Sequence, residues 1–379
     1  MNKQLNSISI YYDNLNKLIT ECVTPAMDSL SSDINLWFWE RSCIGGKHLK
    51  VRWREKSGEN STVKKKLLEA VSEFQLKNPS KNSVVYNSSA AKRLIETEKR
   101  NVSEEEIEQK TDCVIETPYE RKADEDASEE LLDILHGFLN DTRKLCTDVI
   151  LSGIDRNLTG LWFTGIFAIE QFGSLEAGCI TFRAHWDNYE NWFKPSVLPE
   201  RIKQHYESNK TEFHKIVKEI MEQGKTGELL YNPIYAEWVE IIQKYRVLIV
   251  AKQNEGVVFM PNATTPQGVI DTNNYLNEQD TQSRAEQFLR RLYSEPDYLG
   301  SLSFSRDLQE TRIMVNLVYH VISNLGISAY QRMAYCYFLH RSVEEVLNID
   351  ILDKLDEQMK SYLSENQLFE SEPMMEELS

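Results

Sequence analysis

The 379-residue sequence lacks the short motifs that mark the common classes of nucleotide and metal enzymes. It contains no P-loop, no GxGxxG after an expected strand, no HExxH and no GxSxG. The six cysteines are widely separated and form no CxxC pair, so neither a zinc site nor a disulfide framework is expected. We therefore expect no metal and no cofactor, and cysteines that pack as small apolar side chains.

Long apolar runs and an excess of positive charge are absent as well. No window reaches eighteen consecutive apolar residues, and the first residues lack the pattern of a secretory signal. The formal net charge of −16 and the pI near 5.1 argue against general affinity for nucleic acid or anionic lipid. We expect a cytoplasmic protein that binds neither nucleic acid nor membrane.

The composition, 41% hydrophobic and 27% charged, is sufficient for a sizeable core. Residues 1–77 predict a βαββ unit with a strand at 6–12, a helix at 14–31 and a hairpin at 34–41 and 47–55. Asp13 can cap the helix, and Pro25 predicts a kink or an early stop in it. A further helix is expected at 61–77, and the order of elements suggests a ferredoxin-like α+β unit.

The remaining chain divides by composition into three parts. Residues 78–130 predict a polar, acidic and partly disordered insertion that contains a short strand around Cys113–Glu116. Residues 131–352 predict a mostly helical region, and residues 353–379 an acidic tail with a disordered end. The helices are expected at 127–151, 158–172, 197–224, 233–250, 282–295, 307–324 and 328–348, with a strand at 257–261 and a loop at 262–281. The expected fold class is α+β, an N-terminal ferredoxin-like unit elaborated by a largely helical C-terminal two-thirds.

The second strand of the hairpin predicts one apolar and one cationic face. Alternation places Leu49, Val51 and Trp53 on the apolar face. The cationic face carries His48, Lys50, Arg52 and Arg54. In an acidic protein such a face favours an anionic or strongly polar ligand. The alternative is a solvent-exposed strand face with ordinary charge pairs.

Two later segments also carry candidate residues. Residues 181–193 combine Arg183, His185 and Trp186 with further aromatic side chains, which suits a peptide or heterocycle site unless the aromatics pack inward. Residues 314–328 place His320 in an otherwise apolar helix, beside Tyr319. His320 can act as a general acid or base, or can be a core histidine.

These segments carry a family resemblance. YYDNLNKLITECVTPAMDSL followed by WFWERSCIGGKHLKVRWR resembles the opening of the C-terminal domain of class I lanthipeptide dehydratases. It is similar also to the stand-alone "thiopeptide-type bacteriocin biosynthesis" proteins. Arg41, Gly46, His48 and Arg52 match the family's WFFIRY-like and GGxHLRLR-like strands, while Lys50 replaces an arginine. FLNDTRKL, ITFRAHWDNY and YHVISNLGI resemble further family segments in the family's order.

Two departures from the family pattern bear on the reaction. The YxxExxRYGG stretch is reduced, near residues 118–126, to Tyr119, Glu120 and Arg121. The arginine of the family's HMxxNR segment has no counterpart, because Asn324 is followed by Leu325. Both segments supply cations that an enzyme eliminating glutamate would need for its leaving group.

The resemblance implies action on a ribosomally made precursor peptide, by one of two chemistries. One branch joins two dehydroalanines by a formal (4+2) aza-cycloaddition, which forms the central nitrogen heterocycle and can expel the leader peptide. The other branch eliminates glutamate from glutamylated serine or threonine. The departures favour the cyclase, with the eliminating half of a split dehydratase as the alternative and a non-catalytic peptide-binding scaffold as a third possibility.

Roles for individual residues follow from the resemblance. The expected partners are the leader and core of the precursor, and the chain can also work with a separate glutamylating dehydratase subunit. The expected catalytic residues are His320, Tyr319, His185 and Arg183. The expected substrate-binding residues are Arg41, His48, Lys50, Arg52, Trp186 and Asn324.

Overall fold

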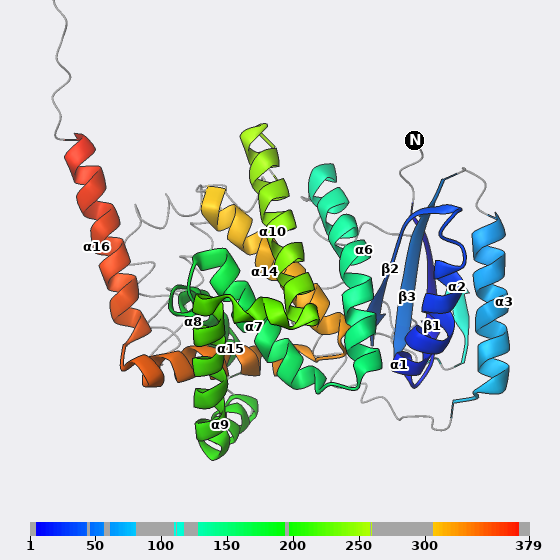
Figure 1. Cartoon of the computed structure of the whole chain (residues 1–379), viewed down its shortest axis with the longest axis horizontal. Helices are drawn as coiled ribbons and strands as arrows, with labels where there is room; N and C mark the ends of the chain where they lie inside the picture. The colour runs from blue at the N-terminus through cyan, green and yellow to red at the C-terminus, as the bar shows by residue number, and fades with distance from the viewer. Residues whose placement is uncertain are drawn as a thin grey trace, which may run out of the picture. The chain divides into compact units, whose positions relative to one another are not determined.

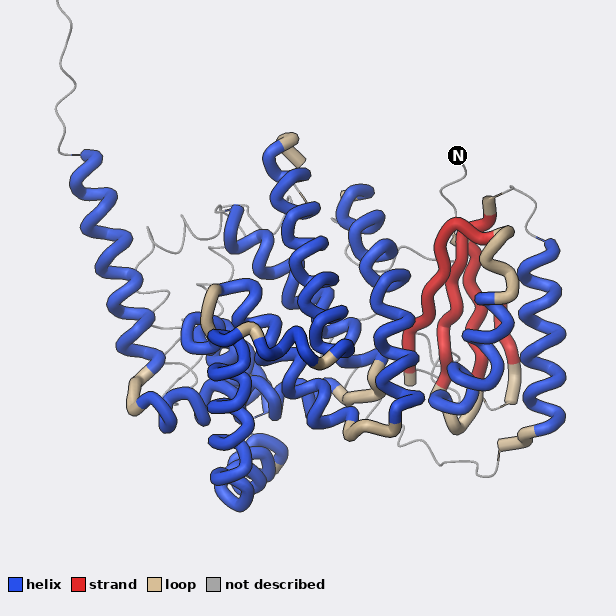
Figure 2. Tube along the Cα trace, in the orientation of Figure 1, coloured by secondary structure: helices blue, strands red, loops and turns tan. Residues whose placement is uncertain are grey.

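The computed structural model describes residues 5–43, 46–56, 61–80, 110, 112–116, 128–193, 197–257, 259 and 306–370. The chain forms two compact units. The first unit comprises residues 1–125, 129–156 and 319–327. The second comprises residues 126–128, 157–318 and 328–379. All the described strands lie in the first unit, and the described part of the second unit is helical (Figure 2).

The first unit is built on a four-stranded antiparallel sheet. Its strands are β1 (Asn6–Tyr11), β2 (Ile34–Ser42), β3 (His48–Glu55) and β4 (Val114–Glu116), in the order β2-β3-β1-β4. The predicted hairpin is confirmed as β2 and β3, and the predicted short strand as β4, which pairs with β1. This order, with helices after β1 and β3, is that of a ferredoxin-like unit and confirms the predicted α+β class.

The two faces of β3 differ as alternation predicts. Leu49, Val51 and Trp53 are at most 1% exposed. Leu49 and Val51 lie opposite Ile10 and Ile8 of β1, so that β-branched and leucine side chains fill one side of the sheet. Between these buried positions, Lys50, Arg52 and Arg54 are only partly buried and point to the other face.

The helix after β1 is continuous but changes its winding. It consists of α1 (Leu15–Leu18), the π-helical segment η1 (Ile19–Val23) and α2 (Thr24–Asp28). Pro25 has no N–H, so the regular hydrogen-bond ladder is interrupted and the helix widens before the proline and ends soon after it. The N-cap is Asn14, whose side chain accepts from the Lys17 N–H at 3.1 Å, and not Asp13 as predicted.

Two longer helices flank the sheet. In Figure 1, α3 (Ser61–Lys77) and α6 (Glu129–Ser152) lie on opposite sides of the strands. Leu139 of α6 packs with Phe38 of β2 in a small core cluster. Asn140 of α6 accepts a hydrogen bond from the Trp37 N–H at 3.2 Å. This N–H lies on the outer edge of β2, where none of the described strands pairs with it.

The second unit is made of helices in its described part. They are α7 (Arg156–Phe172), α8 (Leu175–Phe193), α9 (Leu198–Thr226), the 3-10 helix η2 (Glu228–Tyr231), α10 (Pro233–Asn254), α14 (Arg306–Asn324), α15 (Ala329–Leu347) and α16 (Ile351–Glu370). Arg156 and the last turn of α14 belong to the first unit. Trp238 stacks on Phe163 at 4.9 Å and donates to its carbonyl oxygen at 3.0 Å, which joins α10 to α7 in the core.

The helices predicted at 127–151, 158–172, 197–224, 233–250, 307–324 and 328–348 are confirmed, with small shifts at their ends. Part of the predicted acidic tail, up to Glu370, forms α16. Val257 and Phe259 lie in no strand, and the rest of the strand predicted at 257–261 falls outside the described residues. The same holds for the loop at 262–281, the helix at 282–295, most of the insertion and residues 371–379. None of the described helices combines the length and apolar character needed to cross a membrane.

The burial of one face of β3 predicts how much stability is lost when a side chain on that face is shortened. Leu49→Ala should lower the free energy of unfolding by about 2–5 kcal/mol, because Leu49 is 0% exposed and its removal leaves a cavity. The matched control is Leu76→Ala, since Leu76 is 85% exposed and should cost less than about 0.5 kcal/mol. Chemical denaturation measures both, and equal losses would contradict the assignment of the buried face.

Candidate functional site

A carboxylate on the hairpin joins two of the predicted site residues. Glu40 Oε2 accepts a hydrogen bond from Arg52 Nη1, and Glu40 Oε1 lies 3.5 Å from His320 Nδ1. Glu40 comes from β2, Arg52 from β3 and His320 from the last turns of α14. We call these three residues the Glu40 cluster. The first unit therefore brings together Arg52 and His320, which are far apart in the sequence.

The charge of Glu40 is set by its neighbours. Burial alone would raise the pKa of Glu40, but Arg52, His320 and Lys50 outweigh it and lower that pKa to about 2. Glu40 is therefore an anion at neutral pH, fixed by Arg52 and facing the imidazole of His320. The His320 side chain is 39% exposed, so it differs from the buried core histidine that the sequence left open. A carboxylate beside an accessible imidazole is an arrangement suited to proton transfer.

Asn324 fastens the end of α14 to the edge of the hairpin. Its Nδ2 donates to the Trp39 carbonyl oxygen at 3.1 Å, and its Oδ1 accepts from the Arg41 N–H at 3.3 Å. Arg41 Nε also donates to the Asn324 carbonyl oxygen at 2.6 Å. Asn324 is 2% exposed. Its amide is thus engaged within the fold and positions the end of α14, while substrate binding by Asn324 stays a prediction.

His48, which the sequence predicted as a substrate-binding residue, is buried within the first unit. It is 2% exposed, its Nδ1 lies 3.0 Å from the Gly46 carbonyl oxygen, and its ring lies 4.5 Å from that of Tyr11. Burial lowers the pKa of His48 to about 4, so the ring is neutral at neutral pH. Alternation put His48 on the cationic face, but at the end of the strand Tyr11 covers it.

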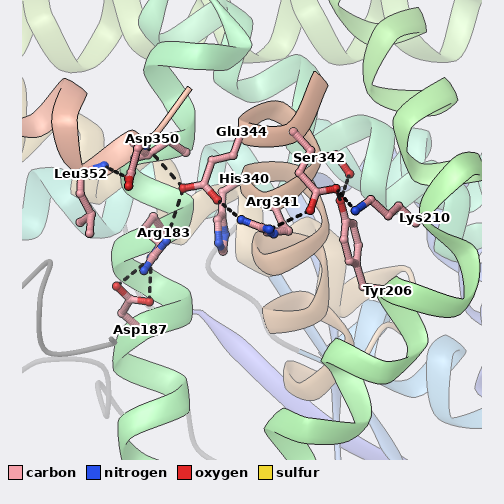
Figure 3. Close-up of polar contacts among 12 residues, drawn as sticks. Arg183, Asp187, Tyr206, Lys210, His340, Arg341, Ser342, Glu344, Asp350 and Leu352 are labelled. Carbon is pink, nitrogen blue, oxygen red and sulfur yellow. Dashed lines mark hydrogen bonds and ion pairs between the residues drawn. The ribbon is translucent and has the colours of Figure 1, made fainter. Parts of the chain in front are cut away.

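Arg183 lies in the second unit within an ion-pair network that includes α8 and α15. Its Nε donates to both carboxylate oxygens of Asp187 at 2.9 Å, and its Nη1 lies 3.4 Å from Glu344 Oε1 (Figure 3). Burial raises the pKa of Asp187 to about 7, against the opposing effect of Arg183. The guanidinium is therefore occupied by two buried carboxylates and ties the two helices together.

A second network beside it crosses the kink of α9 at Asn209. Glu345 Oε2 accepts from Tyr206 Oη at 3.0 Å and from Lys210 Nζ at 2.7 Å. Arg341 Nη2 lies 2.8 Å from the other carboxylate oxygen. Figure 3 shows Tyr206, Lys210 and Arg341 converging in this region. Because its partners lie on both sides of the break, Glu345 holds the kinked helix in one shape.

The other two predicted residues of α8 pack within the second unit. Trp186 is 2% exposed, with its ring 4.6 Å from that of Tyr337 and 5.6 Å from that of Tyr189. Trp186 therefore packs inward, as the alternative interpretation of this segment predicts. His185 is partly buried, and desolvation together with Arg332 and Arg312 lowers its pKa to about 4.

The predicted site residues thus divide between the units. The first unit holds Arg41, His48, Lys50, Arg52, Tyr319, His320 and Asn324. The second unit holds Arg183, His185 and Trp186. Tyr319 is half-buried beside His320 on α14. Over the described ranges, no group of three or more His, Cys, Asp or Glu side chains is arranged to hold a metal ion.

Sequence reasoning missed two residues that matter here, Glu40 and Arg156. Glu40 had a usable signal, since it lies opposite Lys50 across the hairpin, where opposite charges commonly pair. Arg156, the first residue of α7, donates to the Leu325 carbonyl oxygen at 3.0 Å. No local sequence pattern predicts the contact between Arg156 and Leu325, because these residues are distant in the sequence.

Comparison with known proteins identifies the family. The family model described as "Lantibiotic biosynthesis dehydratase C-term" matches residues 7–343. The chain belongs to this family. This confirms the resemblance drawn from the hairpin and the three later segments.

Solved structures of similar fold agree with that assignment. A structure titled "Pyridine synthase, TbtD, from thiomuracin biosynthesis" is 16% identical, with a TM-score of 0.66 over 92% of this chain and 100% of that one. The structure of TsrL is 15% identical, with a TM-score of 0.67 over 92% of this chain and 97% of that one. At these identities the likeness establishes a shared fold. No curated protein matches the chain.

The Glu40 cluster predicts a pH dependence of stability. The pKa of Glu40 falls to about 2 in the folded state, so its stabilising contribution is present above the unfolded pKa near 4.5 and is lost as the pH falls toward 2. Between these values the melting temperature of the wild type should fall more steeply than that of Glu40→Gln. The control Glu69→Gln, at a carboxylate that is 65% exposed, should keep the wild-type slope. Parallel slopes for the wild type and Glu40→Gln would contradict the ion pairing of Glu40.

Proposed function

We propose that this protein is a cyclase in thiopeptide biosynthesis. It acts on a ribosomally made, dehydrated precursor and joins two dehydroalanines by a formal (4+2) aza-cycloaddition, a reaction that can expel the leader peptide. Membership of the lantibiotic dehydratase C-terminal family supports a role in peptide maturation. The shared fold with a pyridine synthase supports the cyclase branch. The observation that carries the proposal is an accessible His320 beside Glu40, a carboxylate of the hairpin that is itself paired with Arg52.

The chemistry requires positioning and proton transfer more than charge neutralisation. Two distant peptide segments must be held together, which can lower the barrier by about 7–11 kcal/mol. Hydrogen-bond donors can bias an amide toward the tautomer that reacts, and formation of the aromatic ring moves further protons. We assign these proton transfers to His320, whose imidazole Nδ1 lies 3.5 Å from Glu40 Oε1 and is oriented by that carboxylate. Tyr319 is the proposed neighbouring donor.

Binding of the precursor is assigned to the cationic part of the first unit. Lys50 is the proposed contact from the hairpin, and Arg41 the proposed contact beside α14. The proposal gives no substrate contact to His48, Asn324, Trp186 or Arg183, because each is accounted for by packing or ion pairs within its own unit. The partner is the precursor peptide, and a separate glutamylating dehydratase would supply its dehydroalanines in the cytoplasm.

Elimination of glutamate is the second candidate. A base and a cation in one cluster, His320 and Arg52, would suit it. Against it, the hairpin arginines nearest to His320 would have to be free to receive the carboxylate of the departing glutamate. Arg52 is already paired with Glu40, and Arg54 lies 3.7 Å from Asp133. The engaged state of these arginines favours cyclisation.

The test uses two precursors and one variant. With a precursor that bears thiazoles and two dehydroalanines, the wild type should yield the macrocycle, detected by mass spectrometry. His320→Ala should slow that reaction by about 10²–10⁴, the usual contribution of general acid–base catalysis. The control His205→Ala, at an exposed histidine of α9, should retain the wild-type rate.

Three outcomes would overturn parts of this proposal. Release of glutamate from a glutamylated precursor, without macrocycle formation, would assign the protein to the eliminating branch. Binding of the precursor with neither reaction would make it a scaffold. A cyclisation rate of His320→Ala within a few-fold of the wild type would remove His320 from catalysis.

A further inference from the structure

Two guanidinium groups lie side by side at the C-terminal end of α14. Arg41 Nε donates to the Asn324 carbonyl oxygen at 2.6 Å, and Arg156 Nη1 donates to the Leu325 carbonyl oxygen at 3.0 Å. Both also reach the side-chain oxygen of Asn16, at 2.6 Å from Arg41 Nη2 and 3.4 Å from Arg156 Nη1. All of these acceptors are neutral oxygens, and all five residues belong to the first unit.

This pair has no carboxylate to balance it within the described part of the chain. The side-chain hydrogen bonds of Arg41 and Arg156 end on neutral oxygens, and Arg41 otherwise lies over the Trp39 ring. Burial, with Arg156 as the neighbouring positive charge, lowers the pKa of Arg41 to about 10. Two adjacent cations destabilise each other, and an anion between them would relieve that repulsion.

Capping of α14 explains only part of the arrangement. Cations are favourable near a helix C-terminus, where the last carbonyl groups lack partners within the helix. A guanidinium, however, has five N–H donors. The contacts to Asn16, Asn324 and Leu325 use Nε and Nη2 of Arg41 and Nη1 of Arg156. Arg41 Nη1 and the remaining nitrogens of Arg156 donate to none of the described residues, and both side chains are only partly buried.

Gly326 leaves space beside both guanidiniums. It ends α14 with a φ of +85°, and the Ile327 N–H bonds back to the Ile322 carbonyl oxygen at 3.2 Å in a Schellman-type stop. A Cβ atom at Gly326 would lie 3.0 Å from Arg156 Nη1 and 3.3 Å from Arg41 Nη1. The exposed surface of Gly326 is thus a point that both arginines reach.

We infer that Arg41 and Arg156 form a carboxylate-binding site over Gly326. A carboxylate is planar, carries one negative charge and accepts paired hydrogen bonds from the forked edge of a guanidinium. The inference rests on the proposed function only for the source of that group, an acidic side chain of the precursor peptide. The site would anchor the peptide beside the hairpin and does not include the Glu40 cluster.

A binding experiment without any reaction tests this site. The probe is a fluorescently labelled oligoglutamate peptide, followed by anisotropy, with oligoglutamine of the same length as the uncharged comparison. The wild type should bind oligoglutamate and not oligoglutamine. Arg156→Gln should weaken that binding about tenfold or more, the loss expected for one charge-assisted pair.

Two further variants separate the site from general charge and from misfolding. Lys144→Gln removes the same charge from an exposed position of α6 and should bind as the wild type does. Arg156→Lys keeps the charge but loses the fork, and should bind more tightly than Arg156→Gln. Circular dichroism confirms that each variant is folded.

Several results would overturn the carboxylate site. They are unchanged binding by Arg156→Gln, an equal loss in Lys144→Gln, absence of wild-type binding to oligoglutamate, and stronger competition by inorganic phosphate than by acetate. Any of them, together with macrocycle formation by the wild type, would remove this inference and leave the proposed function in place.

Discussion

The ion pairs of Glu40 are the interaction on which the site of the first unit depends. A carboxylate on β2 would be unfavourable at this partly buried position without the Arg52 guanidinium and the His320 imidazole beside it. Together they keep Glu40 charged, with its pKa lowered to about 2. One anion thereby links a strand pair formed early in the chain to a helix formed late in it.

Other contacts of the first unit fix the position of α14 relative to the hairpin. Asn324 hydrogen-bonds to the backbone of β2, and Gly326 stops α14 in the turn that follows. The position of His320 is therefore fixed from both sides, by its carboxylate and by the end of its own helix. The second unit places its buried charges differently, since Arg183, Asp187 and Glu344 form a network of α8 and α15.

Much of the fold could be predicted from local patterns. Alternation in the hairpin gave its buried and cationic faces, and helical periodicity gave α6, α7, α9, α10, α14 and α15. The site was harder to predict than the fold, because its contacts join segments that are distant in the sequence. Arg52 and His320 could be named from the family resemblance, whereas the only sign of the carboxylate between them was its place opposite Lys50 in the hairpin. The burial of His48 and Trp186 could not be predicted, because a pattern shows which face a side chain takes and not what covers it.

The central claim is that Glu40 and His320 act as one unit in cyclisation, and a double-mutant cycle tests it most directly. Single-turnover rates of macrocycle formation would be measured for Glu40→Gln, His320→Ala and the variant carrying both changes. If Glu40 acts through His320, the double variant should be no slower than His320→Ala alone. Rate losses that multiply would contradict the account, because they would mean that the two side chains contribute independently.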